Sequence, residues 1–161
     1  MARAIRAYRP EDQARVLEIC LAAFAPIHEG FEAALGPVIF ARAYPDWRGD
    51  YARTIAAIGE NPAEQVHVIE QDGEIAGFAF SSVDAKQRTG ELGLNAVDPA
   101  HQGKGLGGTL YAFILADLKA RGAETAYVGT GADAAHAPAR AAYERAGFDR
   151  SLPTVHYFRV L

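Results

Sequence analysis

A glycine-rich run between two apolar segments constrains the fold more than any other part of this sequence. Residues Gln102–Gly108 read Gln-Gly-Lys-Gly-Leu-Gly-Gly, following the apolar segment Leu92–Val97 and opening the amphipathic segment Leu106–Ala120. This order predicts a strand, a tight turn and a helix. Glycines let backbone amides approach a ligand, and a helix start adds unpaired amides and the positive end of its dipole. The run is therefore a candidate site for a phosphate or pyrophosphate.

Two well-known phosphate-binding motifs can be compared with this run. The P-loop pattern G-x-x-x-x-G-K-[ST] is not met, because Lys104 is followed by Gly105. The dinucleotide pattern G-x-G-x-x-G is matched literally by Gly103, Gly105 and Gly108. Its usual place is the first strand–helix unit of a domain, whereas several strands precede the run here. A dinucleotide-dependent oxidoreductase remains an alternative function.

Composition narrows the class of protein. A chain of 161 residues, 50% hydrophobic and 22% charged, has the size of one compact domain, and we expect residues 1–161 to form it. A net charge of −4 disfavours nucleic acid as a partner, and no segment has the roughly 20 apolar residues that cross a membrane. Cys20 is the one cysteine, which excludes an internal disulfide and predicts a cytoplasmic protein with Cys20 in its core.

The order of elements predicts an α/β fold with a mixed sheet. Asp72-Gly73 between two apolar runs is a strong hairpin signal, and Gly122 is the expected C-cap of the helix that follows the glycine run. The stretch Pro26–Asn61 is broken by glycines and prolines into short helical pieces rich in aromatic residues. The expected strands are 4–8, 66–70, 75–83, 91–97, 125–128 and 155–160, and the expected helices are 10–25, 106–120 and 138–146.

Two segments carry a family resemblance. Within residues 91–107, Gln102, Gly105 and Gly107 fit the pattern Gln/Arg-x-x-Gly-x-Gly/Ala, and Tyr143 precedes a Gly-Phe pair by four residues. At this spacing, both segments resemble the GNAT family of N-acetyltransferases, over roughly residues 66–148. The resemblance implies a GNAT-like acyl-CoA N-acyltransferase fold, with a mixed central sheet flanked by helices on both faces. It also implies acetyl-CoA as the acetyl donor and no metal.

The resemblance assigns the coenzyme to three parts of the chain. The glycine run is expected to hold the pyrophosphate, and the splayed end of a strand at Asn95–Val97 is expected to pair with the pantetheine arm and polarise the acetyl carbonyl. His136 stands where the family usually has an asparagine that contacts the coenzyme. The expected coenzyme-binding residues are Asn95, Ala96, Val97, Gln102, Gly103, Lys104, Gly105, Leu106, Gly107, Gly108, His136 and Tyr143.

Acetyl transfer to an amine needs an acid and a base. The resemblance places the Tyr143 hydroxyl near the coenzyme sulfur, and a phenol is protonated at neutral pH, so Tyr143 is the candidate acid. Glu91 is the candidate base, because strand alternation puts it on the same face as Asn95 and some relatives have glutamate there. His136 or a water chain is the alternative base. The structural alternatives are packing for Tyr143 and plain solvation for Glu91 and His136.

The acceptor is expected to be a primary amine of a small molecule or peptide. In the family the first helices and the loops near the final strands shape its pocket, so the resemblance implies Pro26–Asn61 and, as a second segment, Ser151–His156. The aromatic residues of the first stretch either line this pocket or simply pack: Phe31, Phe40, Tyr44, Trp47 and Tyr51. The resemblance is also compatible with a homodimer. A non-catalytic acyl-CoA-binding sensor is a further alternative.

Overall fold

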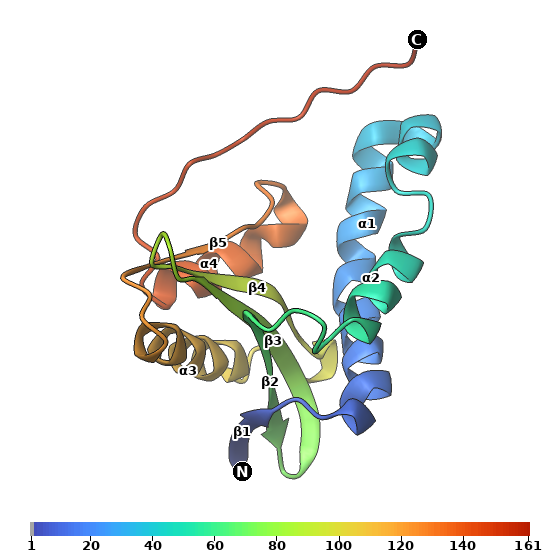
Figure 1. Ribbon diagram of the computed structural model, residues 1–161. Helices are drawn as coiled ribbons and strands as arrows, with labels where there is room; N and C mark the ends of the chain where they lie inside the picture. Colours follow the sequence, from blue (N-terminus) through green and yellow to red (C-terminus); the bar gives the residue numbers. More distant parts are fainter. Residues whose placement is uncertain (1) are drawn as a thin grey trace.

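A five-stranded mixed sheet with helices on both faces forms the centre of the computed structural model, which describes residues 2–161 (Figure 1). The strands lie side by side in chain order, and only the last pair is parallel. The strands are β1 (Arg3–Ala7), β2 (Glu64–Gln71), β3 (Glu74–Asp84), β4 (Thr89–Val97) and β5 (Thr125–Val128). The helices are α1 (Gln13–Ala43), α2 (Trp47–Ala56), α3 (Leu106–Ala120) and α4 (Ala137–Arg145).

Each face of the sheet has its own hydrophobic core. On one face, α1 and α2 cover a cluster that contains Ile19, Phe78 and the fully buried Cys20. On the other, α3 and α4 cover a cluster that contains Leu92, Leu110 and Tyr143. Alternating residues of β3 and β4 supply both clusters, because neighbouring side chains of a strand point to opposite faces. The predicted mixed sheet with helices on both faces is confirmed.

The β2–β3 hairpin and the β4–α3 unit follow their sequence signals. Asp72 and Gly73 both have positive φ, 53° and 88°, as a two-residue hairpin turn that matches the twist of its strands requires. Helix α3 begins at Leu106, directly behind the glycine run, and ends just before Gly122, whose φ is 96°. Positive φ favours glycine at this C-cap position.

Helix α1 is longer than its sequence predicts. The expected end near Ala25 is wrong, because the helix continues through Pro26 and is interrupted only at Gly36, where φ is 75° and ψ is 162°. A proline inside a helix removes one backbone hydrogen bond, and tertiary packing can offset that loss. Here the continuation carries His28 into a cluster of aromatic rings, which supplies the packing.

The predicted last strand at residues 155–160 is also wrong for this structure. Beyond Phe148 the chain has no helix or strand, and Figure 1 shows it running away from the sheet as an extended tail. All residues of Asp149–Leu161 are exposed. A strand is stabilised by hydrogen bonds to a neighbouring strand, and within residues 2–161 this tail has no such neighbour.

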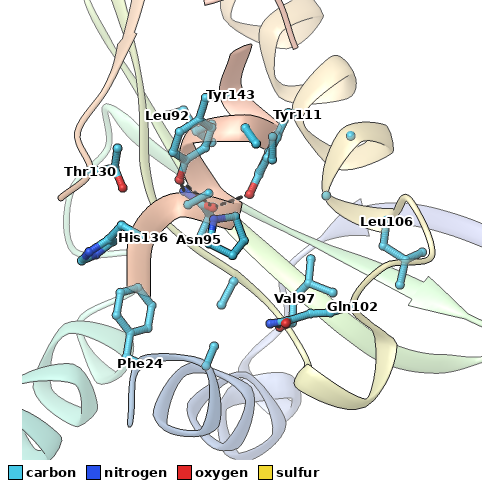
Figure 2. Close-up of a pocket in the computed structure, with 18 of the residues that line it drawn as sticks. Phe24, Leu92, Asn95, Val97, Gln102, Leu106, Tyr111, Thr130, His136 and Tyr143 are labelled. Atoms are coloured by element: carbon cyan, nitrogen blue, oxygen red, sulfur yellow. Dashed lines mark hydrogen bonds between the residues drawn. The ribbon is translucent and has the colours of Figure 1, made fainter. Parts of the chain in front are cut away.

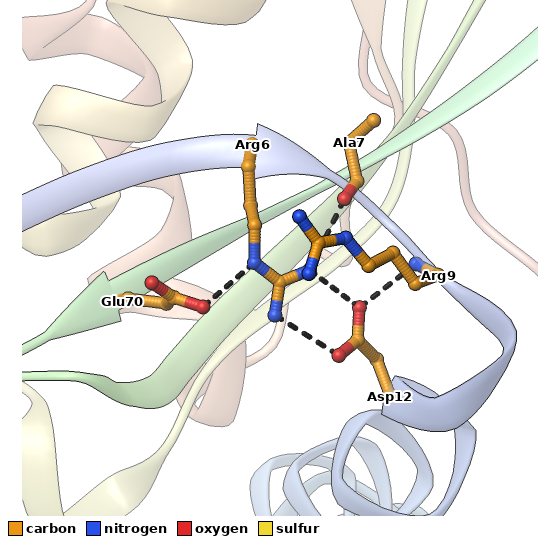
Figure 3. Close-up of polar contacts among 5 residues, drawn as sticks. All are labelled: Arg6, Ala7, Arg9, Asp12 and Glu70. Carbon is orange, nitrogen blue, oxygen red and sulfur yellow. Dashed lines mark hydrogen bonds and ion pairs between the residues drawn. The ribbon is translucent and has the colours of Figure 1, made fainter.

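An ion-pair cluster joins the start of α1 to the edge of the sheet (Figure 3). Arg6 of β1 donates to Asp12 over 2.7 and 3.0 Å and to Glu70 of β2 over 2.7 Å, and the Arg9 amide donates to Asp12 over 2.8 Å. Asp12 is 5% exposed. The hydrogen bonds from Arg6 hold the pKa of the Asp12 carboxyl below its usual value despite the opposing effect of burial.

A second contact joins α1 to the turn that precedes the glycine run. Arg15 donates to the Ile75 carbonyl of β3 over 3.1 Å and forms an ion pair with Asp98, the residue after β4. Asp98 also accepts from the Ala100 amide over 2.9 Å, which shapes the turn. The first turn of α1 is therefore bound to the turn that leads into the glycine run.

Candidate active site

One cavity of about 1080 Å³ lies where α1, β4, α4 and the start of α3 meet. It is at the upper end of the volumes of small-molecule pockets, roughly 300–1,000 Å³. Figure 2 shows Gln102 and Leu106 at one end, Phe24 and His136 at the other, and Asn95 between them. The cavity is therefore elongated, with the glycine run and the α1 side as its two ends.

The glycine run forms a concave backbone surface at the first end. Gly103 and Gly105 have φ of 75° and 78°, which only glycine adopts without strain. The amides of Gly103–Gly108 donate no hydrogen bond to the rest of the described chain, and a Cβ on Gly103 or Gly108 would meet no atom within 4 Å. Free amides, open space and a helix start together fit an anion.

Side chains around the run hold it in shape. The Gln102 side chain donates to the Val97 carbonyl over 3.2 Å, and Arg3 of β1 donates to the Lys104 carbonyl over 2.6 Å. The Lys104 ammonium donates to the Ala100 carbonyl over 3.1 Å, and Lys104 does not line the cavity. Arg3 is a supporting residue that sequence reasoning missed, because the contact spans about a hundred residues of chain.

Strand β4 opens toward the cavity at its carboxyl end. Its parallel pairing with β5 ends at Leu92 and Val128, so Gly93–Val97 have no partner on that side. The register with β3 also shifts between Ala79 and Ser81, which marks a bulge in the ladder. Unpaired backbone groups of β4 are thus presented to the cavity, as the resemblance predicts.

Two tyrosine hydroxyls meet at one asparagine in the middle of the cavity (Figure 2). Tyr111 of α3 donates to Asn95 Oδ1 over 2.8 Å, and the Tyr143 hydroxyl lies 3.2 Å from Oδ1 and 3.1 Å from Nδ2. Nδ2 also donates to the Gly93 carbonyl over 2.8 Å. These contacts fix the amide orientation and place both hydroxyls at the opening of β4.

Burial governs the acidity of both phenols. Burial raises the pKa of Tyr143 above its ordinary value of 10, and hydrogen bonding with Asn95 and the Tyr111 hydroxyl offsets only part of this effect. Burial and the neighbouring Tyr143 also raise the pKa of Tyr111. Both groups are protonated at neutral pH.

Glu91 is expected on the same face of β4 as Asn95, and this expectation is wrong. Leu92 packs in the core under α3 and α4, where Asn95 meets Tyr111 and Tyr143, because the bulge interrupts the alternation of the strand, so Glu91 points to the opposite face.

Glu91 and His136 are nevertheless two ionisable side chains that line the same cavity. Glu91 of β4 stands opposite Tyr127 of β5, and contact with its carboxylate raises the pKa of Tyr127. His136, just before α4, binds Asp133 through Nδ1 over 2.6 Å. Burial by itself would raise the pKa of the Asp133 carboxyl. The hydrogen bonds from His136 and from the backbone lower this pKa by a larger amount, so it lies below its usual value. The second ring nitrogen of His136 is left for another partner.

The structure brings together all but one of the predicted site residues. Glu91 and every expected coenzyme-binding residue except Lys104 line the cavity. Ala96 lines the cavity with its backbone, because its side chain packs in the core under α1 and α2. Sequence reasoning missed Tyr111, although a tyrosine on the apolar face of a helix usually needs a partner for its hydroxyl. The wall that α1 contributes consists of Ala22, Ala23, Phe24, Pro26 and Ile27; the last two fall within the expected acceptor stretch Pro26–Asn61, and the first three were missed.

The aromatic residues of the first stretch lie behind this wall. His28 stacks on Trp47 with ring centres 4.2 Å apart, and Phe31, Phe40, Tyr44 and Tyr51 surround it. None of these six residues lines the cavity, although the Phe31 ring lies 6.0 Å from that of His136. Burial lowers the pKa of His28, so its imidazole is neutral and supports the packing of α1 on α2.

Comparisons with known proteins agree with this geometry. The model of the acetyltransferase (GNAT) family matches residues 31–148. The structure has a TM-score of 0.71 to the PaiA N-acetyltransferase of Thermoplasma acidophilum in complex with coenzyme A, at 18% identity over 92% of this chain and 91% of that one. With the ribosomal-protein-S18-alanine N-acetyltransferase of Escherichia coli the TM-score is 0.66, at 23% identity over 94% and 80%. The chain belongs to the GNAT acetyltransferase family.

Curated relatives at higher identity match over a shorter length. A mycothiol acetyltransferase of Streptomyces bingchenggensis is 42% identical over 85 residues, which are 53% of this chain and 27% of that protein. The chain thus spans about a quarter of that relative. Within residues 2–161, no helix is both long and apolar enough to cross a membrane.

Proposed function

We propose that this domain transfers the acetyl group of acetyl-CoA to a primary amine of a small molecule or peptide, by direct attack in a ternary complex. One observation carries the proposal. A single cavity joins the free amides of Gly103–Gly108, the unpaired end of β4 and the hydroxyl of Tyr143. These are an anion site, a row of backbone groups for an extended ligand and a proton donor, in that order along the cavity.

Acetyl-CoA would extend from the anion site, along the backbone of β4, to the hydroxyl of Tyr143. The amides of Gly103–Gly108 and the N-terminus of α3 would bind its pyrophosphate. The backbone of Asn95–Val97 would pair with its pantetheine arm, and an unpaired β4 amide would stabilise the oxyanion, a contact typically worth a few kcal/mol. His136 would contact the coenzyme in place of the family's asparagine, through the ring nitrogen that Asp133 leaves free.

The chain's own groups handle the protons. When bound, acetyl-CoA supplies a thioester carbonyl that an amine can attack, so that a C–N bond forms and the C–S bond breaks. Tyr143 would give its proton to the departing thiolate. Asn95 Nδ2, already 3.1 Å from that hydroxyl, would then donate to the phenolate oxygen. The amine's proton would pass to Glu91.

The assignment of the base can be tested directly, because two candidates line the same cavity. We expect Glu91→Gln to lower kcat/KM by about 10²-fold or more and to change the pH profile of the reaction. His136→Gln should mainly raise the KM for acetyl-CoA if the imidazole contacts the coenzyme. The reverse pattern would identify His136 as the base, and two unaltered pH profiles would point to water.

The acceptor end suggests the kind of amine. The α1 wall is mostly small and apolar, and Glu91 is the one carboxylate on the cavity surface of the described residues. This fits an amine next to an apolar group. Because the curated relatives are mycothiol acetyltransferases, their acceptor belongs in the first panel of amines.

We further propose that residues 1–161 act as one domain, in the cytoplasm and as a homodimer; the buried lone Cys20 agrees with a reducing compartment.

Binding and turnover together test the proposed function. Acetyl-CoA at about 100 times its dissociation constant should stabilise the fold by about 2.7 kcal/mol, measured as a rise in Tm, while NAD(H) should not. An amine panel followed by release of free thiol should then give turnover. Binding without turnover would indicate an acyl-CoA sensor, and a response to NAD(H) alone would indicate a dinucleotide enzyme.

A further inference from the structure

A carboxylate and an imidazole form a close pair in the turn before α4. Asp133 Oδ2 lies 2.6 Å from His136 Nδ1, and Asp133 Oδ1 accepts from the amides of Ala135 and His136 over 3.0 and 3.3 Å. Both carboxylate oxygens therefore have partners. The imidazole is only 13% exposed and lines the cavity, so the pair forms a fixed part of the cavity wall.

The surrounding chain leaves this pair little freedom. Arg140 of α4 donates to the carbonyls of Gly131 and Asp133, each over 2.7 Å, and so closes the turn. A Cβ on Gly131 would collide with both Asp133 Oδ2 and His136 Nδ1. The turn can approach the pair this closely only because residue 131 has no side chain.

The carboxylate determines which ring nitrogen of His136 carries the proton. Burial opposes the charge of Asp133, but the hydrogen bonds from His136 and the backbone keep its pKa below the usual value, so it is ionised at neutral pH. An ionised carboxylate only accepts hydrogen bonds, so the proton of the neutral imidazole lies on Nδ1. Nε2 is then left with a lone pair, and within residues 2–161 the ring's only hydrogen bond is the one at Nδ1.

The other groups that face the imidazole do not change this assignment. On α1, the Phe31 ring lies 6.0 Å away, and the titratable neighbour is His28, which is buried and neutral. On α4, the charged neighbour is Arg140, which can only donate and is occupied by two carbonyls. Neither His28 nor Arg140 can take the place of Asp133 at Nδ1.

We propose that Asp133 is a positioning residue that fixes His136 Nε2 as a hydrogen-bond acceptor for an amide N–H of the coenzyme's pantetheine arm. This inference rests on the proposed function, which places acetyl-CoA in the cavity. Pantetheine carries amide N–H groups as well as amide carbonyls, and a bare ring nitrogen can bind only the former. An asparagine at this position would offer both a donor and an acceptor, whereas the Asp133–His136 pair offers an acceptor alone.

Asp133→Asn should reverse the polarity of the imidazole. The amide oxygen would keep the two backbone N–H groups, and the amide nitrogen would then replace Oδ2 and donate to His136 Nδ1, which moves the ring proton to Nε2. Asp84→Asn is the matched control. Asp84 Oδ1 also accepts the amides two and three residues further on, both over 2.9 Å, but Asp84 does not line the cavity.

Nitrogen-15 NMR of the free protein locates the ring proton, and calorimetry with coenzyme A gives Kd. The His136 signal is assigned by its loss in His136→Gln. The unaltered chain and Asp84→Asn should have the proton on Nδ1, bind coenzyme A equally, and bind it more weakly from about pH 8 to about pH 5 as Nε2 is protonated. Asp133→Asn should have the proton on Nε2, a Kd raised about tenfold near pH 8, as for one lost hydrogen bond, and a smaller change with pH.

Two results would overturn the proposal. A ring proton on Nε2 in the unaltered chain would remove the role of Asp133, and equal Kd values despite a moved proton would exclude the N–H contact. If Asp133→Asn lost the circular dichroism of the fold, the tautomer and the pH dependence of the unaltered chain would still decide. An unaltered chain that bound no coenzyme A would contradict the proposed function, whereas the tautomer is read without any ligand.

Discussion

At the scale of single residues, the two phenols at Asn95 are both buried against the same amide but have different expected roles. Both are buried, both bond to Oδ1, and burial raises the pKa of each. Only the Tyr143 hydroxyl lies close to both Oδ1 and Nδ2. It can therefore donate when protonated and accept when ionised. Tyr111 holds the amide in place, so we regard it as a positioning residue.

Replacement of each hydroxyl separates these roles. Tyr143→Phe should lower kcat by about 10²–10⁴-fold with little change in the binding of acetyl-CoA, because a general acid is lost. Tyr111→Phe is the matched control and should lower kcat far less. Steady-state kinetics with a fixed acceptor measures both effects. Equal losses in the two variants would mean that the hydroxyls act only together, and no loss for Tyr143→Phe would remove the acid role.

The raised pKa of Tyr143 also predicts a pH profile. The acid must be protonated, so its contribution to kcat is present below its pKa and is lost as pH rises through it. Because burial places this pKa above 10, kcat should not fall through Tyr143 ionisation below pH 10. A decline in kcat near pH 8 that disappears in Tyr143→Phe would contradict the assigned environment.

At the scale of elements, the left-handed backbone at Gly105 gives the glycine run its shape. Gly105→Ala should strain the run by about 1–2 kcal/mol and weaken acetyl-CoA binding several-fold, seen as a higher Kd by calorimetry. Gly122→Ala is the matched control, since Gly122 also has positive φ but lies at the other end of α3. The control should lose similar stability and keep its Kd. Equal Kd values in both variants would exclude the run as the coenzyme site.

The link between β1, β2 and the start of α1 gives a prediction for stability. Asp12→Asn should lower the free energy of unfolding by about 2 kcal/mol at pH 7, because charge-assisted hydrogen bonds to Arg6 are lost. The pKa of Asp12 is lowered in the fold, so this contribution is present above the unfolded pKa near 4 and is lost as pH falls through the folded value. Urea unfolding at pH 7 and below pH 3 measures it.

A surface pair provides the control for this change. Asp50 binds Arg53 with both side chains well exposed, so water screens the pair and Asp50→Asn should change stability far less than Asp12→Asn at any pH. If the Asp12 and Asp50 variants lost equal stability at pH 7, the cluster in Figure 3 would hold α1 no more firmly than a solvated pair.

At the scale of the whole molecule, local signals predicted the second half of the chain better than the first. The bounds of β5 and α3 follow from periodicity, Gly122 and the glycine run, because each signal lies within the element it specifies or directly beside it. The continuation of α1 through Pro26 depends on aromatic packing between segments far apart in the sequence. The expected strand at 155–160 has the right residues, but a strand also needs a partner.

The same distinction applies to the site. Gln102–Gly108 and Tyr143 were found because short motifs carry them. Tyr111, Arg3 and the first part of the α1 wall, Ala22–Phe24, were not, because their positions around the cavity depend on how α1, α3 and β1 pack on the sheet. Motifs therefore identified the donor half of the site, and only the fold revealed the wall opposite.

The contact of Arg15 with Ile75 and Asp98 makes the donor end of the cavity more rigid than the end at Phe24. It fastens α1 to β3 and to the turn before the glycine run, whereas the part of α1 beyond Pro26 is held by its own aromatic cluster and by α2. The α1 wall and the glycine-run side of the cavity are thus connected at the donor end and are not connected by these contacts at the other end. Small tilts of α1 would leave the glycine run unchanged and change the width at Phe24, where acceptors of different size would enter.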